Sequence, residues 1–468
     1  MKSSYHLVLL ALLQASVNGE NSQECVTSVD ATTDYFPEKV EPTESQQWSI
    51  EYQNTYKILT NSWISKSYLL YQCGTEAPQD VSQYDGVFSV PVQGVSLSST
   101  PQVTFVELLS RRTSIDAWVG SFSFIHSPCL NKMIDDGDVV TLNSDDGTNV
   151  TLLTDSGLDN TVFFAGGDTT YQNEVQIHAF EENFNLATFE WVKFYSTFFN
   201  LEKEANEIFE ATKNRYDCTV QNAGILSADK EKKPTVLWGS WCSSCGGWAV
   251  AKSCPEYYCE FAESCGATLL TTEAGSVTTS WGVNYMTTEE FVEFGKDADH
   301  FIYTATDLLS TVYGTFKDDF ANMTAVLNNE VYDTAGAGPN SWFEQRLAEP
   351  DAILQDFCTI VGTENPAVLH KLSFLRHVDD IVPISGVCTD ISAAPETYGT
   401  NCEALSQVTD APVVTDPPTD PPTDPPTNRA TDSATDPAPD GDEPTKEDAA
   451  PGANLVLGLV ALLAAFLL

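Results

Sequence analysis

The chain has 468 residues, of which 42% are hydrophobic and 11% aromatic, and its formal net charge is −45. The length exceeds one average domain and suits two, and the apolar content is sufficient for a packed core. A negative charge of this size excludes nucleic acids and other polyanions as main partners, and it is typical of a solvated extracellular surface.

Residues 1–19 have the pattern of a secretory signal peptide. Lys2 precedes an apolar run over 7–13, and small residues lead to a cleavage site after Gly19. This pattern predicts export through the secretory pathway. Two Asn-x-Thr sequons, at Asn149 and Asn322, are predicted glycosylation sites, which agrees with export.

The folded part, residues 20–407, contains all 12 cysteines. An even number of cysteines in an exported chain predicts up to six disulfides. Their spacing leaves the pairing open.

Residues 20–187 are predicted to form an N-terminal α/β lobe with a leading hairpin. Apolar and polar residues alternate over 48–73, which indicates the hairpin. A strand, a loop at 98–101, a helix over 103–109, a strand from Ile115 and an aromatic loop at 121–128 then follow the order of a βαβ unit. Ligands of such sheets collect at the carboxyl ends of strands, so we expect these two loops to lie there together.

Residues 188–216 are predicted to form one long amphipathic helix, because their apolar residues recur with the helical period. Such a helix is long enough to join two lobes.

Residues 217–407 are predicted to form a second α/β lobe. A buried strand starts after Pro234, Thr287 and Glu290 have the spacing of a capping box, and the closing segments at 342–357 and 366–377 have helical patterns. The predicted fold class is therefore α/β, with two Rossmann-like lobes joined by one long helix and stabilised by disulfides.

Trp241-Cys242-Ser-Ser-Cys245 follows a predicted strand, as a thioredoxin-type redox motif does. This spacing gives one hypothesis, a secreted thiol oxidoreductase using Cys242 and Cys245. Two observations weigh against it. No proline lies between 255 and 339 to supply the loop that faces the cysteines in such folds, and the crowding of cysteines over 242–265 favours structural disulfides.

No catalytic residue, metal site or cofactor is predicted. The histidines are scattered without metal-ligand spacing, and the motifs of nucleophilic catalysis are absent from the sequence. We therefore expect a protein that is not an enzyme.

Several aromatic residues lie at predicted strand ends or on loops, where they offer flat contact area to a bulky planar ligand. The alternative is that they cover disulfide-rich loops. The residues that we select are Phe122, Phe124, Trp238, Trp241 and Trp281.

Residues 408–450 and 451–468 indicate a stalk and a hydrophobic anchor signal. The stalk is rich in Pro, Thr and Asp and repeats Thr-Asp-Pro-Pro, a composition that favours extended polyproline conformation. The final apolar run is shorter than the roughly 20 residues of a spanning helix and follows small residues, which is typical of a GPI-anchor signal. A short transmembrane helix is the alternative. Both interpretations place the folded part on the outer face of the plasma membrane.

The run Gly94-Val-Ser-Leu-Ser-Ser-Thr-Pro-Gln-Val-Thr-Phe-Val-Glu-Leu-Leu, followed by Ile115-Asp-Ala-Trp-Val-Gly-Ser, resembles the N-lobe of helical-backbone periplasmic binding proteins, which serve vitamin B12 and iron-siderophore uptake. Segments from Phe189, Lys233 and Ala325 resemble the inter-lobe helix and C-lobe of the same family. The cysteine-rich insert is a departure from it. With a eukaryotic anchor, the chain is most similar to the cobalamin acquisition proteins of diatoms and other algae, and next to algal ferrichrome-type binding proteins.

This resemblance implies a surface protein that captures cobalamin for uptake in a cleft between two lobes, with little hinge motion. It places Ser121, Phe122 and Phe124 on one wall and Trp281 on the C-lobe, to which we add Trp238 and Trp241 as strand-end aromatics. A membrane transporter or endocytic partner would complete uptake.

Ferric hydroxamate siderophores are the alternative ligand, because anionic catecholates usually require clustered arginines and this chain has few. A structural or adhesive surface protein is a third hypothesis.

Overall fold

The computed structural model describes residues 19–142, 151–158, 161–167, 171, 173–280, 282–305, 309–383 and 386–405. The predicted signal peptide, the sequon at Asn149, Trp281, the stalk and the anchor signal therefore lie outside the described residues. Within these ranges, none of the helices combines the length and apolarity needed to cross a bilayer.

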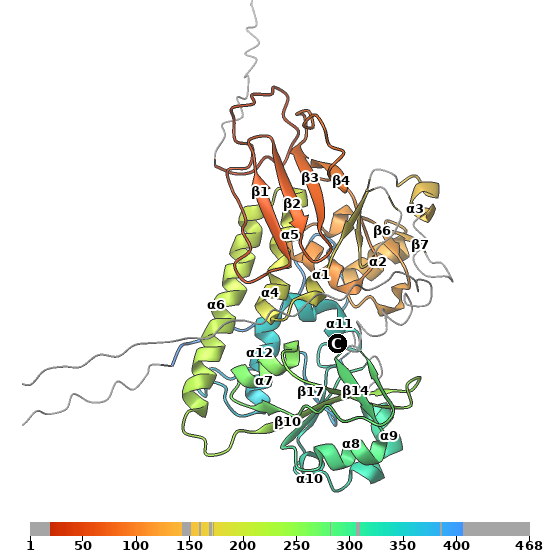
Figure 1. The fold of residues 1–468 in the computed structure, drawn as a ribbon, viewed down its shortest axis with the longest axis vertical. Coiled ribbons are helices and arrows are strands. Elements are labelled where there is room, and N and C mark those ends of the chain that lie inside the picture. The colour runs from red at the N-terminus through yellow and green to blue at the C-terminus, as the bar shows by residue number, and fades with distance from the viewer. Residues whose placement is uncertain are drawn as a thin grey trace, which may run out of the picture.

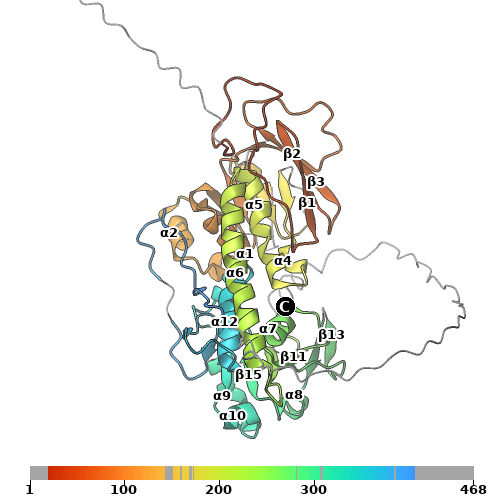
Figure 2. The same ribbon diagram turned by 90° about the vertical axis from the view of Figure 1, so that its left-hand side faces the viewer.

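The protein has an α/β fold of two lobes, which confirms the predicted fold class. The lobes are stacked along the long axis of the molecule, and helix α6 (Glu202–Ser227) runs alongside both of them (Figures 1 and 2). Each lobe has its own main hydrophobic core under its own sheet.

The sheet of the N-lobe is parallel, with strand order β7-β6-β5-β8-β9. Its central strands are buried along their whole length, as is typical of a parallel sheet covered on both faces. This is a Rossmann-like order, in which the winding direction reverses between β5 and β8. The strands are β5 (Val95–Leu97), β6 (Ile115–Val119), β7 (Val140–Leu142), β8 (Val162–Ala165) and β9 (Glu174–Gln176).

The helices of the N-lobe include five α-helices and three short 3-10 helices among the described residues. They are α1 (Thr100–Leu108), η1 (Arg112–Ser114), η2 (Phe122–Phe124), α2 (Pro128–Asp136), α3 (Thr151–Asp155), η3 (Ala179–Glu181), α4 (Asn185–Phe189) and α5 (Trp191–Phe199). Helix α5 is buried throughout and forms the centre of the N-lobe core.

The predicted leading hairpin is part of a four-stranded sheet, which packs on α5. Trp48 contacts Phe194 edge-on at 6.0 Å between ring centroids, and Phe88 contacts Phe198 at 5.8 Å. The strands are β1 (Trp48–Tyr52), β2 (Tyr56–Asn61), β3 (Lys66–Gln72) and β4 (Gly86–Val90), and all pairs except β3–β4 are antiparallel.

The prediction of one helix over 188–216 is wrong, because this range contains the end of α4, the nine-residue α5 and the first part of α6. Helices α5 and α6 are separated at Asn200. This residue has a left-handed backbone (φ 55°), and its amide donates hydrogen bonds to the Ser22 carbonyl at 2.8 Å and to Gln72 Oε1 at 2.9 Å. Lys57 donates to Asn200 Oδ1 at 3.0 Å and forms a fully buried ion pair with Glu202. Polar groups of Ser22, Lys57 and Gln72 therefore hold the chain in the broken conformation at Asn200. The sequence prediction missed the break because it used only the spacing of apolar residues.

The C-lobe has a mixed sheet with strand order β13-β14-β11-β10-β15-β16-β17, and β12 also pairs with β10. Strands β10, β15 and β16 are parallel. The predicted strands after Pro234 and at 300–303 are confirmed. The bounds are β10 (Thr235–Cys242), β11 (Gly247–Ala251), β12 (Thr268–Leu269), β13 (Thr278–Ser280), β14 (Val283–Met286), β15 (His300–Tyr303), β16 (Val331–Asp333) and β17 (Arg376–His377).

The helices of the C-lobe include the predicted capping box, in which Thr287 and Glu290 exchange hydrogen bonds with each other's backbone. The prediction of a helix over 366–377 is wrong. The Asp356 carboxylate accepts hydrogen bonds from the amides of Ser373, Phe374 and Leu375, so this segment is held as a loop before β17. The helices are α7 (Tyr257–Ser264), α8 (Thr288–Gly295), α9 (Leu309–Phe320), α10 (Thr324–Leu327), α11 (Ser341–Gln345), η4 (Arg346–Ala348) and α12 (Pro350–Ile360).

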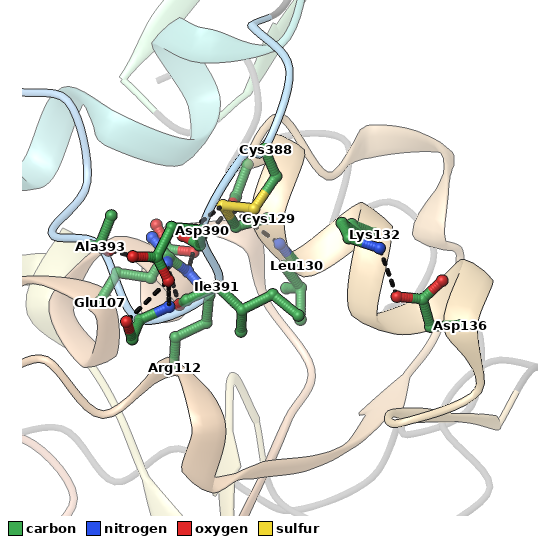
Figure 3. Close-up of a disulfide and its surroundings, with 12 residues drawn as sticks. Glu107, Arg112, Cys129, Leu130, Lys132, Asp136, Cys388, Asp390, Ile391 and Ala393 are labelled. Carbon is green, nitrogen blue, oxygen red and sulfur yellow. Dashed lines mark hydrogen bonds and ion pairs between the residues drawn. A yellow bond between two sulfur atoms is a disulfide. The ribbon is translucent and has the colours of Figure 1, made fainter.

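Six disulfides close, as predicted, and none of the cysteines in the described residues is free. Residues 386–405, which we call the strap, are tied to the rest of the molecule by two of them. Cys129–Cys388 joins the strap to α2 of the N-lobe, and Cys218–Cys402 joins it to α6. Figure 3 shows the first of these bonds beside Arg112, which donates to the strap carbonyls of Ile391 and Ala393 at 2.6 and 2.9 Å.

Candidate functional site

The carboxyl edges of the two sheets meet at the lobe interface. Asn340 follows β16 of the C-lobe, and its side-chain amide donates to the carbonyl oxygen of Ser123, which follows β6 of the N-lobe, at 3.2 Å. Since β5 and β6 are neighbouring parallel strands, the loops at 98–101 and 121–128 lie at the same edge, as expected. Loops from both lobes therefore surround this junction, where open α/β sheets bind their ligands.

The reversal of strand order in the N-lobe is marked by a contact between the loops after β5 and β8. Ser98 Oγ donates to the Phe164 carbonyl at 3.3 Å and accepts from the Gly166 amide at 3.2 Å. The loop containing Ser98 was predicted to lie at this edge, but the loop containing Gly166 and Gly167 was not. A pair of glycines directly after an apolar run is the sequence signal that could have predicted a loop here.

The aromatic loop of the N-lobe is fixed to the C-lobe through Glu344 of α11. The buried Glu344 carboxylate accepts hydrogen bonds from the amides of His126 and Ser127, at 2.5 and 2.7 Å. Burial, together with the nearby negative charge of Glu107, raises the pKa of Glu344 well above its usual range. Burial also lowers the pKa of His126 to about 4, so its imidazole is neutral at pH 7.

Ser121 and Phe124, two of the predicted ligand-binding residues, lie at this edge. Ser121 is exposed, and its hydroxyl lies 2.8 Å from that of Ser123. The Phe124 side chain is 38% exposed, which is unusual for a phenylalanine beside a lobe interface. The backbone of Phe122 lies between them in η2. Direct contact of these residues with a ligand stays a prediction.

Trp238 and Trp241 of β10 are held in separate packing clusters. Trp238 is 6% exposed and stacks on Tyr258, with ring centroids 5.5 Å apart. Trp241 is half-buried, and its ring centroid lies 4.8 Å from that of Phe316. Residues three apart on a strand point to opposite faces of the sheet. The structure therefore does not bring these two rings together, and their ligand contact also stays a prediction.

Cys242 and Cys245 form a disulfide across the turn between β10 and β11. The Cys245 amide lies 3.0 Å from Cys242 Sγ. A thioredoxin-type dithiol depends on the N-terminus of a helix to lower the pKa of its thiol. Here a second strand follows the motif, so the geometry gives the oxidoreductase hypothesis no support.

An exposed aromatic surface, which the sequence analysis missed, flanks the same edge. We call Trp63, Phe180 and Phe184 the aromatic rim; their side chains are 50%, 44% and 50% exposed. Asn61, at the end of β2, donates to the carbonyl of Gln176, the last residue of β9, at 3.0 Å. The β2–β3 turn that carries Trp63 therefore lies at the carboxyl edge of the N-lobe sheet.

The contacts of His178 bring Phe180 close to the hairpin that carries Trp63. Asn61 Nδ2 lies 3.1 Å from His178 Nδ1, and the His178 and Phe180 rings lie 6.0 Å apart. Phe184 is the N-cap of α4. A tryptophan in a hairpin turn, where polar residues are usual, was the signal for Trp63.

Two hollows lie away from this edge. One of about 550 Å³ is lined by Arg111, Leu201 and Glu204, where α1 ends near the start of α6. The other, of about 30 Å³, lies beneath the strap and is lined by His370 and Thr400. The described residues contain no group of three His, Cys, Asp or Glu side chains that could hold a metal ion.

No protein-family model matches the chain. A curated relative, an uncharacterized lipoprotein of Methanocaldococcus jannaschii, is 24% identical over 303 residues, which cover 59% of this chain and 67% of the relative.

Two solved structures are similar to the chain over part of its length. A periplasmic haem-binding protein of Pseudomonas aeruginosa is 12% identical with a TM-score of 0.45, over 60% of this chain and 96% of that chain. The triscatecholate siderophore-binding protein FeuA of Bacillus subtilis, complexed with ferri-bacillibactin, is 15% identical with a TM-score of 0.42, over 58% and 94%.

Proposed function

We propose that the chain is an extracytoplasmic substrate-binding protein that captures a bulky metal chelate between its lobes, and that it acts by binding rather than by catalysis. The observation that carries this proposal is the meeting of the two carboxyl edges, shown by the contact between Asn340 and Ser123. Exposed aromatic residues border this junction on the N-lobe, where a large apolar ligand gains most from flat contact area.

The ligand that we propose is cobalamin, with a ferric hydroxamate siderophore as the alternative. Arg111 and Arg112 are adjacent in sequence, but they do not form an anion site. Arg112 is buried against Glu107 and the strap, and Arg111 donates to Gln23 Oε1 at 2.6 Å. A chelate with little net charge therefore suits this acidic chain better than a ferric catecholate.

The proposed setting is the outer surface of the plasma membrane, with uptake completed by a membrane transporter or an endocytic partner. Asn322 supports an exported chain, because its side chain is exposed in the turn before α10, where an oligosaccharide can be attached. Its glycosylation stays a prediction.

The test is a calorimetric titration of the purified full chain with cyanocobalamin and, separately, with ferrichrome. We expect saturable binding of cyanocobalamin near one molecule per chain, weakened about tenfold by Phe124→Ala and by Trp281→Ala. Leu327→Ala is the control, since this exposed side chain lies on α10 of the C-lobe. Binding of ferrichrome alone would transfer the function to iron uptake. Absence of binding to both would contradict the proposed function.

A further inference from the structure

Arg346 is a half-buried arginine with no carboxylate partner among the described residues. Arg112, Arg215 and Arg376 form ion pairs with Glu107, Asp351 and Asp333. In the part of the chain that the structure describes, no hydrogen bond or ion pair joins the Arg346 guanidinium to another group. Its central carbon instead lies 3.9 Å from the centre of the Tyr257 ring and 5.9 Å from that of Trp342.

This guanidinium lies where the two lobes join. Arg346 begins η4, which packs against α1 and α4 of the N-lobe. Its stacking partner Tyr257 begins α7 of the C-lobe, and the Tyr257 carbonyl accepts a hydrogen bond from the Asn185 side chain at 3.1 Å. Asn185 directly follows Phe184 of the aromatic rim. Glu344, which binds the aromatic loop of the N-lobe, lies two residues before Arg346. The cation therefore lies at the lobe interface that holds the candidate site.

The positive charge of the Arg346 guanidinium is not neutralised by a carboxylate of the described residues. Arg346 is half-buried, and the loss of solvent lowers the pKa of its guanidinium, which remains charged at any physiological pH. Stacking on Tyr257 supplies part of the lost solvation, but among the described residues no protein acceptor bonds the five N–H donors of the guanidinium. A carboxylate or phosphate offers oxygens with the matching planar spacing.

We propose that Arg346, held in place on the Tyr257 ring, binds a phosphate or carboxylate oxygen of the captured chelate. This inference rests on the proposed function and specifies its ligand further. One guanidinium can neutralise one anionic group, so it fits a chelate with a single such group, for example the phosphodiester of cobalamin. A triply charged ferric catecholate would need several cations.

Matched ligands test this contact. Dicyanocobinamide lacks the phosphodiester and nucleotide of cyanocobalamin. We expect Arg346→Met to raise the Kd of the purified full chain for cyanocobalamin at least tenfold and to leave that for dicyanocobinamide within twofold. Binding of ferrichrome and of neither corrinoid would overturn this contact, because ferrichrome has no free carboxylate or phosphate. Arg346→Lys should give an intermediate Kd, since lysine keeps the charge but not the planar fork.

Arg111→Met is the matched control, because Arg111 lies at the far end of α1. Unchanged thermal unfolding of each variant excludes a general defect in folding. An equal loss for both corrinoids, or no loss for either, would overturn the role of Arg346 while the proposed function stands. Failure of the unaltered chain to bind cyanocobalamin, dicyanocobinamide or ferrichrome would overturn the proposed function and this inference with it.

Discussion

Glu349 has one carboxylate oxygen buried without a hydrogen-bond partner among the described residues, while the other accepts from the Tyr398 amide at 2.5 Å. Burial is the main reason that the pKa of Glu349 is raised to about 8. In the unfolded chain this group ionises near its usual value of 4.5. Between these two values the folded state holds a proton that the unfolded state has lost, so stability falls as the pH rises.

We expect Glu349→Gln to remove this decline, because a neutral amide avoids the cost of a buried charge. The gain in the free energy of unfolding at pH 8 should be on the order of 4 kcal/mol, with little change at pH 4.5. Denaturant unfolding at both pH values measures it, and Glu403→Gln is the control because Glu403 is exposed on the same strap. A gain of equal size at both pH values would contradict the explanation.

The Lys57–Glu202 pair makes a second prediction at this scale. Both side chains are fully buried, and burial lowers the pKa of Lys57. Glu202→Gln leaves the ammonium without its counter-charge, so we expect a loss of about 3–5 kcal/mol in the free energy of unfolding. Glu20→Gln, which breaks the exposed pair with Lys203, should cause no measurable change. Comparable losses in the two variants would show that the buried pair has no special role.

At the scale of elements, the β2–β3 hairpin carries Trp63 to the edge of a different sheet. If the aromatic rim contacts the ligand, Trp63→Ala should raise the Kd for cyanocobalamin about tenfold, since an aromatic contact of this size contributes roughly 1.5 kcal/mol. Hydroxyl-radical footprinting provides an independent measurement, in which bound ligand should protect Trp63 and Phe184 from oxidation. Protection confined to Phe124 would limit the ligand to the aromatic loop.

At the scale of the whole molecule, the strap restricts motion between the lobes. Cys129–Cys388 closes a loop with a sequence separation of 259, whereas Cys254–Cys259 closes one of 5. Loop entropy therefore predicts that replacing the first pair by serines costs about 2–5 kcal/mol and that replacing the second costs less. Hydrogen exchange at the amides of His126 and Ser127, which bind Glu344 across the interface, should accelerate only in the first variant. Equal exchange in both would show that the strap does not hold the lobes.

Sequence patterns predicted the elements whose burial follows a regular period. The buried strands after Pro234 and at 300–303, the hairpin over 48–73 and the Thr287 capping box are all confirmed. Their local chemistry determines them, because alternation, continuous apolar runs and capping spacing act within a few residues.

The candidate site was only partly predictable for the same reason. The position of Ser121 and Phe124 at this edge was predictable because they follow a strand closely, whereas Trp63 and Arg346, which we propose as ligand contacts, come from segments far from that loop in sequence. Trp238 was selected as a strand-end aromatic, yet its ring stacks with those of Tyr258 and Phe357 in the C-lobe core. A single sequence does not show whether an aromatic ring will be buried by an element that is distant in sequence.

By itself, the sequence determined that this is an acidic, disulfide-rich α/β chain with two lobes, since composition and periodicity fix the class of each segment. The tertiary structure decided the break at Asn200, the six disulfide pairings, the loop over 366–375 and the juxtaposition of the two carboxyl edges. Each of these depends on hydrogen bonds or covalent bonds between residues that are distant in sequence, and such contacts exist only after the chain has folded.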